Sequence, residues 1–161
     1  MKIGVISDTH LNGYDRRLKK IFDEYFFDCD MILHAGDLVS ADVLEAFRVK
    51  DVKAVHGNMD YLSVKQALPD RLVLEIDGFK IGLIHGWGAP YDIEERLLKT
   101  VGPVDCLVYG HTHQAVNEVK NGILFFNPGS AMDKRFASHR TIGILTTSKE
   151  ITGEIIELGD E

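Results

Sequence analysis

The stretch Lys2-Ile3-Gly4-Val5-Ile6-Ser7-Asp8-Thr9-His10 joins a short apolar run to two residue types that commonly bind metals. The run Lys2–Ser7 predicts a buried strand, because it is short, apolar and bounded by polar residues. Asp8 and His10 are two positions apart, and side chains two apart on an extended chain point to the same side. We therefore expect this strand to present a carboxylate and an imidazole together at its carboxyl end.

Four further apolar runs end in short motifs of the same kind. These motifs are Gly36-Asp37, Gly57-Asn58-Met59-Asp60, His85-Gly86 and Gly110-His111-Thr112-His113. Open sheets that contain parallel strands bind ligands outside the carboxyl ends of those strands. The five motifs together supply seven candidate metal ligands, which are Asp8, His10, Asp37, Asn58, His85, His111 and His113. Oxygen and nitrogen donors in this mixture suit divalent transition metals.

The first half of the chain alternates predicted strands and helices. Strands are expected at Lys2–Ser7, Met31–Ala35 and Val52–Val55, with helical periodicity at Arg16–Phe26 and Ala41–Phe47 between them. A strand–helix–strand–helix–strand order of this kind implies parallel strands joined by right-handed crossovers.

The second half is dominated by hairpin signals. Asp77-Gly78 and Asn121-Gly122 are turn dipeptides that favour two-residue hairpins, and a last pair of strands is expected at Thr141–Thr147 and Ile151–Leu158. Between the hairpins we expect a helix at Ile93–Lys99 and a strand at Val104–Tyr109. Two sheets can then pack face to face with helices outside, an α/β double β-sheet sandwich with αββα layers. No repeat, linker or break in composition divides residues 1–161, so we expect a single domain.

Composition narrows the classes of function. The formal net charge of −7 argues against a protein that binds nucleic-acid backbones in general. No apolar run approaches the roughly 18 residues of a membrane span, so no membrane association is expected. Cys29 and Cys106 lack a ligand-like spacing and predict buried free thiols, which indicates a cytoplasmic protein.

The ordered motifs resemble the calcineurin-like metallophosphoesterase superfamily, specifically its small single-domain microbial phosphodiesterase branch. The resemblance covers nearly the whole chain and implies the same double β-sheet sandwich. It also implies two metal sites that share Asp37. One metal would be held by Asp8, His10, Asp37 and His113, and the second by Asp37, Asn58, His85 and His111.

The resemblance implies a phosphodiesterase whose substrate is a small phosphodiester or another phosphoester. Two metals can hold a bridging hydroxide for in-line attack on phosphorus, and Asp37, Asn58 and His111 are the candidate catalytic residues among the ligands. Manganese is the first choice because the donors are mixed, while nickel, cobalt, iron and zinc also fit. The physiological substrate and the oligomeric state stay open, with a homo-oligomer among the alternatives.

Two positions depart from the family pattern. Met59 stands where much of the superfamily has a histidine that contacts phosphate or protonates the leaving group, and a thioether can do neither well. Trp87 stands near a position where the branch often has another histidine, and could form an aromatic wall for a base or aryl group or serve in packing.

Two other functions compete with this interpretation. The chief alternative is a metal-binding scaffold of the same fold that docks a protein partner, as does a retromer subunit with an incomplete site. A different metal hydrolase would need a His-x-His-x-Asp-His motif, which the chain lacks. We expect His34 and His56 to lie in the core or to support a metal ligand. Asp60 is expected to support a ligand or to form a turn. Arg135 and Arg140 are expected to lie in solvent.

Overall fold

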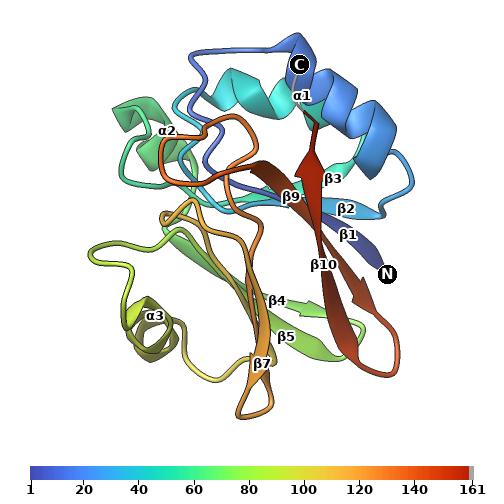
Figure 1. Cartoon of the computed structure of the whole chain (residues 1–161), viewed down its shortest axis with the longest axis vertical. Helices are drawn as coiled ribbons and strands as arrows, with labels where there is room; N and C mark the ends of the chain where they lie inside the picture. The colour runs from blue at the N-terminus through green and yellow to red at the C-terminus, as the bar shows by residue number, and fades with distance from the viewer. Residues whose placement is uncertain (160–161) are drawn as a thin grey trace.

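Two β-sheets face each other, with helices on their outer sides (Figure 1). The computed structural model describes residues 1–159, in which ten strands form two five-stranded sheets. The first sheet has the order β10-β9-β1-β2-β3, and the second has the order β4-β5-β6-β8-β7. This architecture confirms the double β-sheet sandwich expected from the sequence.

The strands of the first sheet are β1 (Lys2–Ile6), β2 (Met31–His34), β3 (Asp51–Ala54), β9 (Arg140–Thr147) and β10 (Ile151–Leu158). The second sheet consists of β4 (Arg71–Ile76), β5 (Phe79–Ile84), β6 (Cys106–Val108), β7 (Val116–Lys120) and β8 (Ile123–Asn127). Pairs β1–β2 and β2–β3 are parallel, as the alternating first half predicted. The final hairpin pairs antiparallel with β1, so it belongs to the first sheet and not to a separate second-half unit.

Helices cover the outer face of each sheet. Along the first sheet lie α1 (Arg16–Ile21), a π-helical segment η1 (Phe22–Phe26) and a 3-10 helical segment η2 (Ala41–Phe47). Their apolar side chains pack with Ile6 and Ile32. On the second sheet, α3 (Ile93–Val101) packs Leu97 against Leu107. Helix α2 (Leu62–Ala67) has six residues, too few for a clear helical pattern, and was not predicted.

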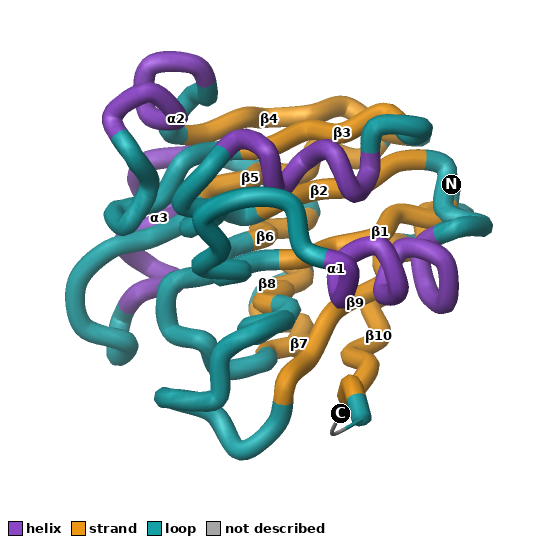
Figure 2. The backbone as a smooth tube through the Cα atoms, turned by 90° about the horizontal axis from the view of Figure 1, so that it is seen from above, coloured by secondary structure: helices purple, strands orange, loops and turns teal. Residues whose placement is uncertain are grey.

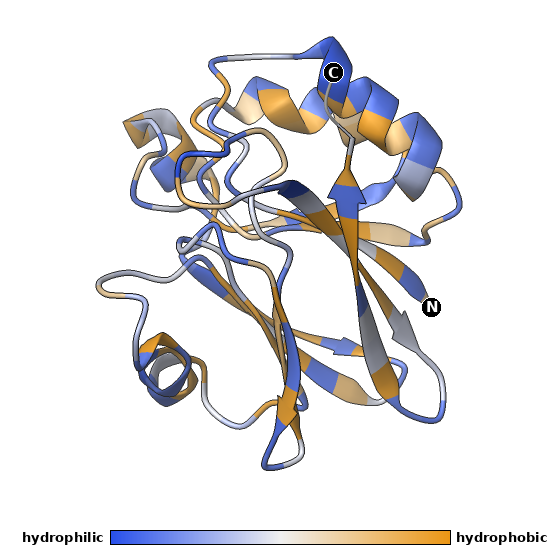
Figure 3. Cartoon of the chain, in the orientation of Figure 1, coloured by the Kyte–Doolittle hydropathy of each residue, from blue (hydrophilic) through white to orange (hydrophobic). Residues whose placement is uncertain are grey.

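The core between the sheets is apolar from both sides. Val5 and Leu33 of the first sheet share one buried cluster with Leu83 and Val108 of the second, all fully buried. Apolar and polar residues alternate along several strands (Figure 3), as expected for strands with one face toward such a core. The predicted hairpin turns are confirmed, since Asp77, Gly78, Asn121 and Gly122 all have positive φ.

The longest loops gather on one side of the strands (Figure 2). Loops after β1, β2, β3, β5 and β6 carry the seven candidate ligands. No helix within residues 1–159 is long and apolar enough to cross a membrane.

Candidate metal centre

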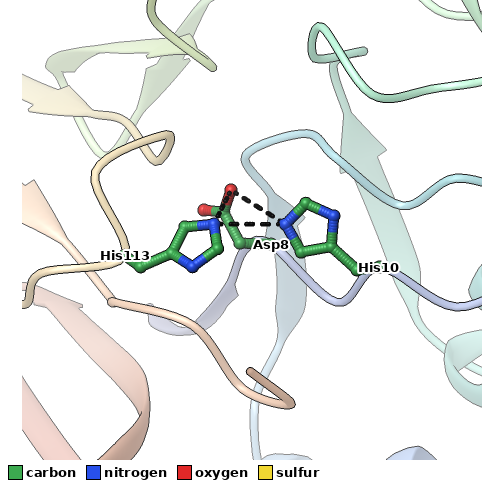
Figure 4. Close-up of side chains that lie close together, drawn as sticks. All are labelled: Asp8, His10 and His113. Atoms are coloured by element: carbon green, nitrogen blue, oxygen red, sulfur yellow. Dashed lines mark hydrogen bonds and ion pairs between the residues drawn. The ribbon is translucent and has the colours of Figure 1, made fainter. Parts of the chain in front are cut away.

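Two groups of buried donor atoms form where these loops meet. The first contains Asp8, His10 and His113 (Figure 4). The Nε2 atoms of the two histidines lie 3.1 Å apart. Asp8 Oδ1 lies 3.3 Å from Nε2 of His113 and 3.7 Å from Nε2 of His10. Three donor atoms therefore face one point between a loop of the first sheet and a loop of the second.

The second group contains Asp8, Asp37 and His85. His85 Nε2 lies 3.2 Å from Asp37 Oδ2 and 3.9 Å from Asp8 Oδ1. Asn58 Oδ1 is also 3.2 Å from this nitrogen, so the amide oxygen joins the group. Asp37 Oδ2 lies 3.8 Å from His10 Nε2 as well, so this one carboxylate oxygen faces histidines of both groups.

His111 lies beside these groups and not within them. Its ring centroid is 5.5 Å from that of His85, and its Nε2 is 2.9 Å from the carbonyl oxygen of Gly88. A carbonyl only accepts, so this contact requires an Nε2–H, which leaves the lone pair of a neutral ring on Nδ1. The same logic applies to His85, whose Nδ1 is 2.7 Å from the carbonyl oxygen of Ala35 and whose lone pair is then on Nε2.

The donor set fits a divalent cation. Asp8 Oδ1 is a buried oxygen without a hydrogen-bond partner in residues 1–159, although three imidazole nitrogens face it. A buried carboxylate oxygen in that position is compensated when it binds a cation. The His85 tautomer set by Ala35 also directs a free lone pair toward the two aspartates, as in metal-binding histidines whose other nitrogen donates to a carbonyl.

The ligands converge through left-handed backbone conformations. Asp8, His10, Asp37, His111 and His113 have φ values of 53°, 48°, 55°, 71° and 60°. Asp8 and His10 lie in one group as the sequence predicted, but strand β1 ends at Ile6, so they meet through these positive φ values and not through the alternation of an extended chain. Non-glycine residues adopt positive φ at a cost, and such strain is concentrated at functional sites.

Two glycines let the backbone approach the carboxylates closely. A Cβ at Gly57 would collide with Asp37 Oδ1, and a Cβ at Gly110 would collide with Ser7 Oγ and with the carboxylate of Asp8. Any larger residue would therefore push the loops that carry Asn58 and His111 away from the aspartates.

The charges of the cluster shift its titration. Burial alone would raise the pKa of Asp8, but the nearby imidazoles of His10, His113 and His85 and the hydrogen bond from Ser7 lower it well below its usual range. In the metal-free chain His85 takes up a proton on Nε2: burial opposes protonation, yet the contact with Asp37 and the charges of both aspartates raise its pKa to about 9. Both shifts arise because negative carboxylates and positive imidazoles stabilise each other away from water.

Buried polar residues support the ligands. Ser7 Oγ donates to Asp8 Oδ2 at 2.6 Å, and the backbone N–H of His111 donates to the same oxygen at 3.1 Å. Fully buried His34 accepts from the Gly36 N–H through Nδ1, so its Nε2–H donates to Thr9 Oγ1 at 3.1 Å. His34 therefore supports two of the ligand loops, in line with the expectation of a core or supporting histidine.

Asp60 also supports the ligand loops. It is buried, and it accepts hydrogen bonds from the backbone N–H groups of Asp37, Val39 and Gly57. The structure thus gives it a supporting role and not only a turn role.

Sequence reasoning missed Arg96 and Asp133. Arg96 in α3 donates from Nη2 to the carbonyl oxygens of Trp87 and Ala89, both at 2.7 Å. Asp133 Oδ2 lies 3.8 Å from Nδ1 of His113. Neither residue belongs to a motif, because each contacts the site through the three-dimensional arrangement of distant loops.

Comparisons with known proteins identify the family of the chain. The model of the calcineurin-like phosphoesterase superfamily domain matches residues 1–150. A probable metallophosphoesterase of Methanocaldococcus jannaschii is 45% identical over 138 residues, covering 81% of this chain and 68% of that protein. A phosphodiesterase of the same organism is 31% identical over 170 residues, covering 97% and 99%.

Solved structures share the fold over almost the whole chain. One described as a novel archaeal phosphodiesterase has a TM-score of 0.79 and 30% identity, covering 98% of this chain and 100% of its own. Vacuolar protein sorting 29 from Cryptosporidium parvum has a TM-score of 0.72 and 21% identity, covering 99% and 98%, and shows the fold alone.

Proposed function

Because the chain belongs to the calcineurin-like phosphoesterase superfamily, we propose that it hydrolyses phosphodiesters with two divalent cations. The observation that carries this proposal is the convergence of buried carboxylate and imidazole atoms from both sheets on one point. The similarity to a protein named a phosphodiesterase favours diesters over monoesters. In the reaction, a water oxygen bonds to phosphorus in line with the ester bond that breaks, and the leaving oxygen takes up a proton.

The proposed ligand sets overlap the two groups of donor atoms, with Asp37 added to the first group, and with His111 added to and Asp8 left out of the second. Asp8, His10, Asp37 and His113 would hold one cation, and Asp37, Asn58, His85 and His111 would hold the other. The position of Asp37 Oδ2, 3.2 Å from His85 Nε2 and 3.8 Å from His10 Nε2, supports Asp37 as the shared ligand. His111 would contribute Nδ1, since its Nε2 is engaged by Gly88.

When bound, two divalent cations lower the pKa of water and stabilise charge on phosphoryl oxygens. Manganese remains the first choice, with nickel, cobalt, iron and zinc as alternatives, because imidazole and carboxylate donors are mixed. The cations would outweigh the carboxylates of Asp8 and Asp37. The site would then attract an anionic substrate despite the net charge of −7 on the chain.

The residues of the chain itself orient the substrate and shield it from bulk solvent. We assign Asp37, Asn58 and His111 to the catalytic centre, where they border a cavity of about 440 Å³ together with Met59. Met59 offers no proton to a leaving group, so that proton comes from water in this proposal. We also propose a single cytoplasmic domain, which the two buried free thiols, Cys29 and Cys106, support.

Reconstitution tests the proposal. Metals are stripped, each dication is restored separately, and hydrolysis of a monoester, a diester and a cyclic nucleotide is measured beside the metal content. We expect two ions per chain and diester turnover, with Asp8→Asn and His111→Gln abolishing turnover while circular dichroism stays unchanged. His139→Gln is the matched control, because His139 is exposed and outside the candidate ligand set.

Two outcomes would contradict the proposal in different ways. A single ion in the fully active protein would rule out the two-cation mechanism. Two bound ions without hydrolysis of any ester would favour the alternative, a metal-binding scaffold that docks a protein partner.

A further inference from the structure

Two cavities share Asn58 as a lining residue. The first, of about 440 Å³, is bordered by Asn58, Arg135 and Phe136 and reaches the ligands His10 and Asp37. We call it the phenylalanine cavity. The second, of about 330 Å³, is bordered by Asn58, Lys65 and Trp87 and reaches the ligand His85. We call it the tryptophan cavity. Asn58 is the one residue that borders both, so the two spaces meet at the candidate metal centre.

Each cavity pairs one aromatic ring with one cationic side chain. In the phenylalanine cavity, Phe136 is 65% exposed and stands edge-on to the ring of His113, with centroids 5.3 Å apart. Arg135 beside it donates from Nε to Asp133 Oδ2 at 2.7 Å, which holds the start of this loop near His113. The aromatic surface therefore lies directly beside a candidate metal ligand.

The tryptophan cavity repeats this chemistry with different residues. Trp87 is 44% exposed, and its backbone is fixed because Arg96 donates to its carbonyl oxygen at 2.7 Å. Lys65 donates from Nζ to the carbonyl oxygen of Asn58 at 3.0 Å, which places its charge at the boundary of the two cavities. The ring of Trp87 is thus carried by a restrained backbone next to His85.

The exposed rings at these positions can contact a bound ligand. Burying a tryptophan or phenylalanine in the core would stabilise the fold, whereas these two rings leave much of their surface in water next to a charged centre. Stacking of a planar ligand group on an aromatic side chain strengthens binding by at least about fivefold. One aromatic surface on each side of a site for an anionic phosphorus group can hold both substituents of a diester.

We propose that the substrate is a phosphodiester with a planar aromatic group on each side, one held against Phe136 and the other against Trp87. This inference rests on the proposed function and adds the substrate class. A monoester would occupy one cavity only. Two sources share this chemistry, a dinucleotide with two bases and a small diester with two aryl groups.

Binding can be measured before turnover, by rapid mixing. Trp87 is the only tryptophan in the sequence, so its fluorescence reports occupation of its own cavity. The probes are a phosphorothioate-linked dinucleotide, which resists hydrolysis, then diphenyl phosphate, diethyl phosphate and phenyl phosphate, each titrated into the manganese-loaded protein. We expect the two doubly aromatic probes to change the fluorescence and to bind at least about fivefold more tightly than the other two.

Variants separate the two cavities. Phe136→Ala should lower the affinity for the doubly aromatic probes about fivefold and leave the affinity for diethyl phosphate unchanged. Trp87→Ala should have the same effects, measured by calorimetry because this variant lacks the fluorescent ring. Trp87→Phe should restore most of the affinity. Tyr91→Ala is the matched control, because Tyr91 is a 76% exposed aromatic residue of the same loop that borders neither cavity.

The outcomes distinguish this inference from the proposed function. Tighter binding of the dinucleotide supports a nucleotide source, and tighter binding of diphenyl phosphate supports a small aryl diester. Equal affinity for diethyl and diphenyl phosphate, or no effect of the two variants, overturns the inference even if diesters are hydrolysed. Selective binding of the aromatic probes without hydrolysis of any diester overturns the proposed function and leaves the two-sided binding site standing.

Discussion

Asp60 joins two ligand loops through one carboxylate. Its oxygens accept from the N–H groups of Asp37 at 3.2 Å, Val39 at 2.5 Å and Gly57 at 2.6 Å. Asp60→Asn replaces one acceptor oxygen with an NH₂ group that faces backbone donors. We expect the free energy of unfolding in urea to fall by about 1–3 kcal/mol. Asp70→Asn, at an exposed aspartate paired with Arg71, is the control and should have little effect.

Met59 defines a second prediction, on the chemistry of the leaving group. Met59 is 56% exposed and borders the phenylalanine cavity, but a thioether cannot donate a proton. General acid help is typically worth about 10²–10⁴-fold. We therefore expect turnover of diesters to fall steeply as the pKa of the leaving group rises, and Met59→His to flatten that dependence. A shallow slope in the unmodified chain would show that another residue supplies the proton.

His85 predicts how the metal-free chain responds to pH. Its pKa is raised from 6.5 to about 9, so its protonated form stabilises the fold. That contribution is fully present below pH 6.5 and is lost as pH rises through about 9. The lowered pKa values of Asp8 and Asp37 contribute stability that is present above pH 3.8 and lost at lower pH.

Urea unfolding of the metal-free chain at a series of pH values checks this expectation. Stability should decline between pH 6.5 and about 9 in the unmodified chain and much less in His85→Gln. Equal declines in the two proteins would show that His85 is not the group responsible.

Elements were more predictable than the geometry of their loops. The apolar runs identified the strands because burial on a sheet imposes a short apolar pattern, and Asp77-Gly78 and Asn121-Gly122 identified two turns because few residues tolerate positive φ. The pairing of the last hairpin with β1 could not be predicted, since both edges of a sheet accept a strand of suitable pattern.

The candidate ligands were predicted as residue types at strand ends, and not as a geometry. Their close approach depends on Gly57 and Gly110, where a Cβ would collide with the aspartates, and on Asp60, which accepts hydrogen bonds from the N–H groups of two ligand loops. The supporting contacts of Arg96 and Asp133 connect segments far apart in sequence, so no local pattern indicates them.

Helix α3 restrains the loop that follows β5. Arg96 binds the carbonyl oxygens of Trp87 and Ala89, and the carbonyl between them, from Gly88, accepts from His111. Arg96→Ala should release this loop and lower the affinity for the proposed cation at His85 and His111 several-fold. Changes to residues that hold a metal ligand in place commonly have this effect. Manganese titration by calorimetry measures the effect. Lys99→Ala, on the same helix and 75% exposed, should leave both affinities unchanged.

At the scale of the whole molecule, the candidate centre connects the two sheets. Asp8 and Asp37 follow strands of the first sheet, and His85 and His113 follow strands of the second. Each of the two proposed cations would have ligands from both sheets and would therefore resist separation of the sheets. At a free manganese concentration 100 times the Kd, each site should raise the free energy of unfolding by about 2.7 kcal/mol. Asp37→Ala should lose most of the increase, and an unchanged increase would contradict a shared ligand.

The position of β1 within its sheet has a consequence for synthesis. Its neighbours are β2 and β9, and Lys2 pairs with Thr146. On the ribosome, β1 therefore emerges long before the strand that covers one of its edges. An open strand edge pairs readily with other chains, and long-range pairing slows folding. The nascent chain is thus most prone to aggregation until the hairpin of β9 and β10 has been made and has paired with β1. The yield on expression will depend on how well chaperones protect the open edge of β1 until then.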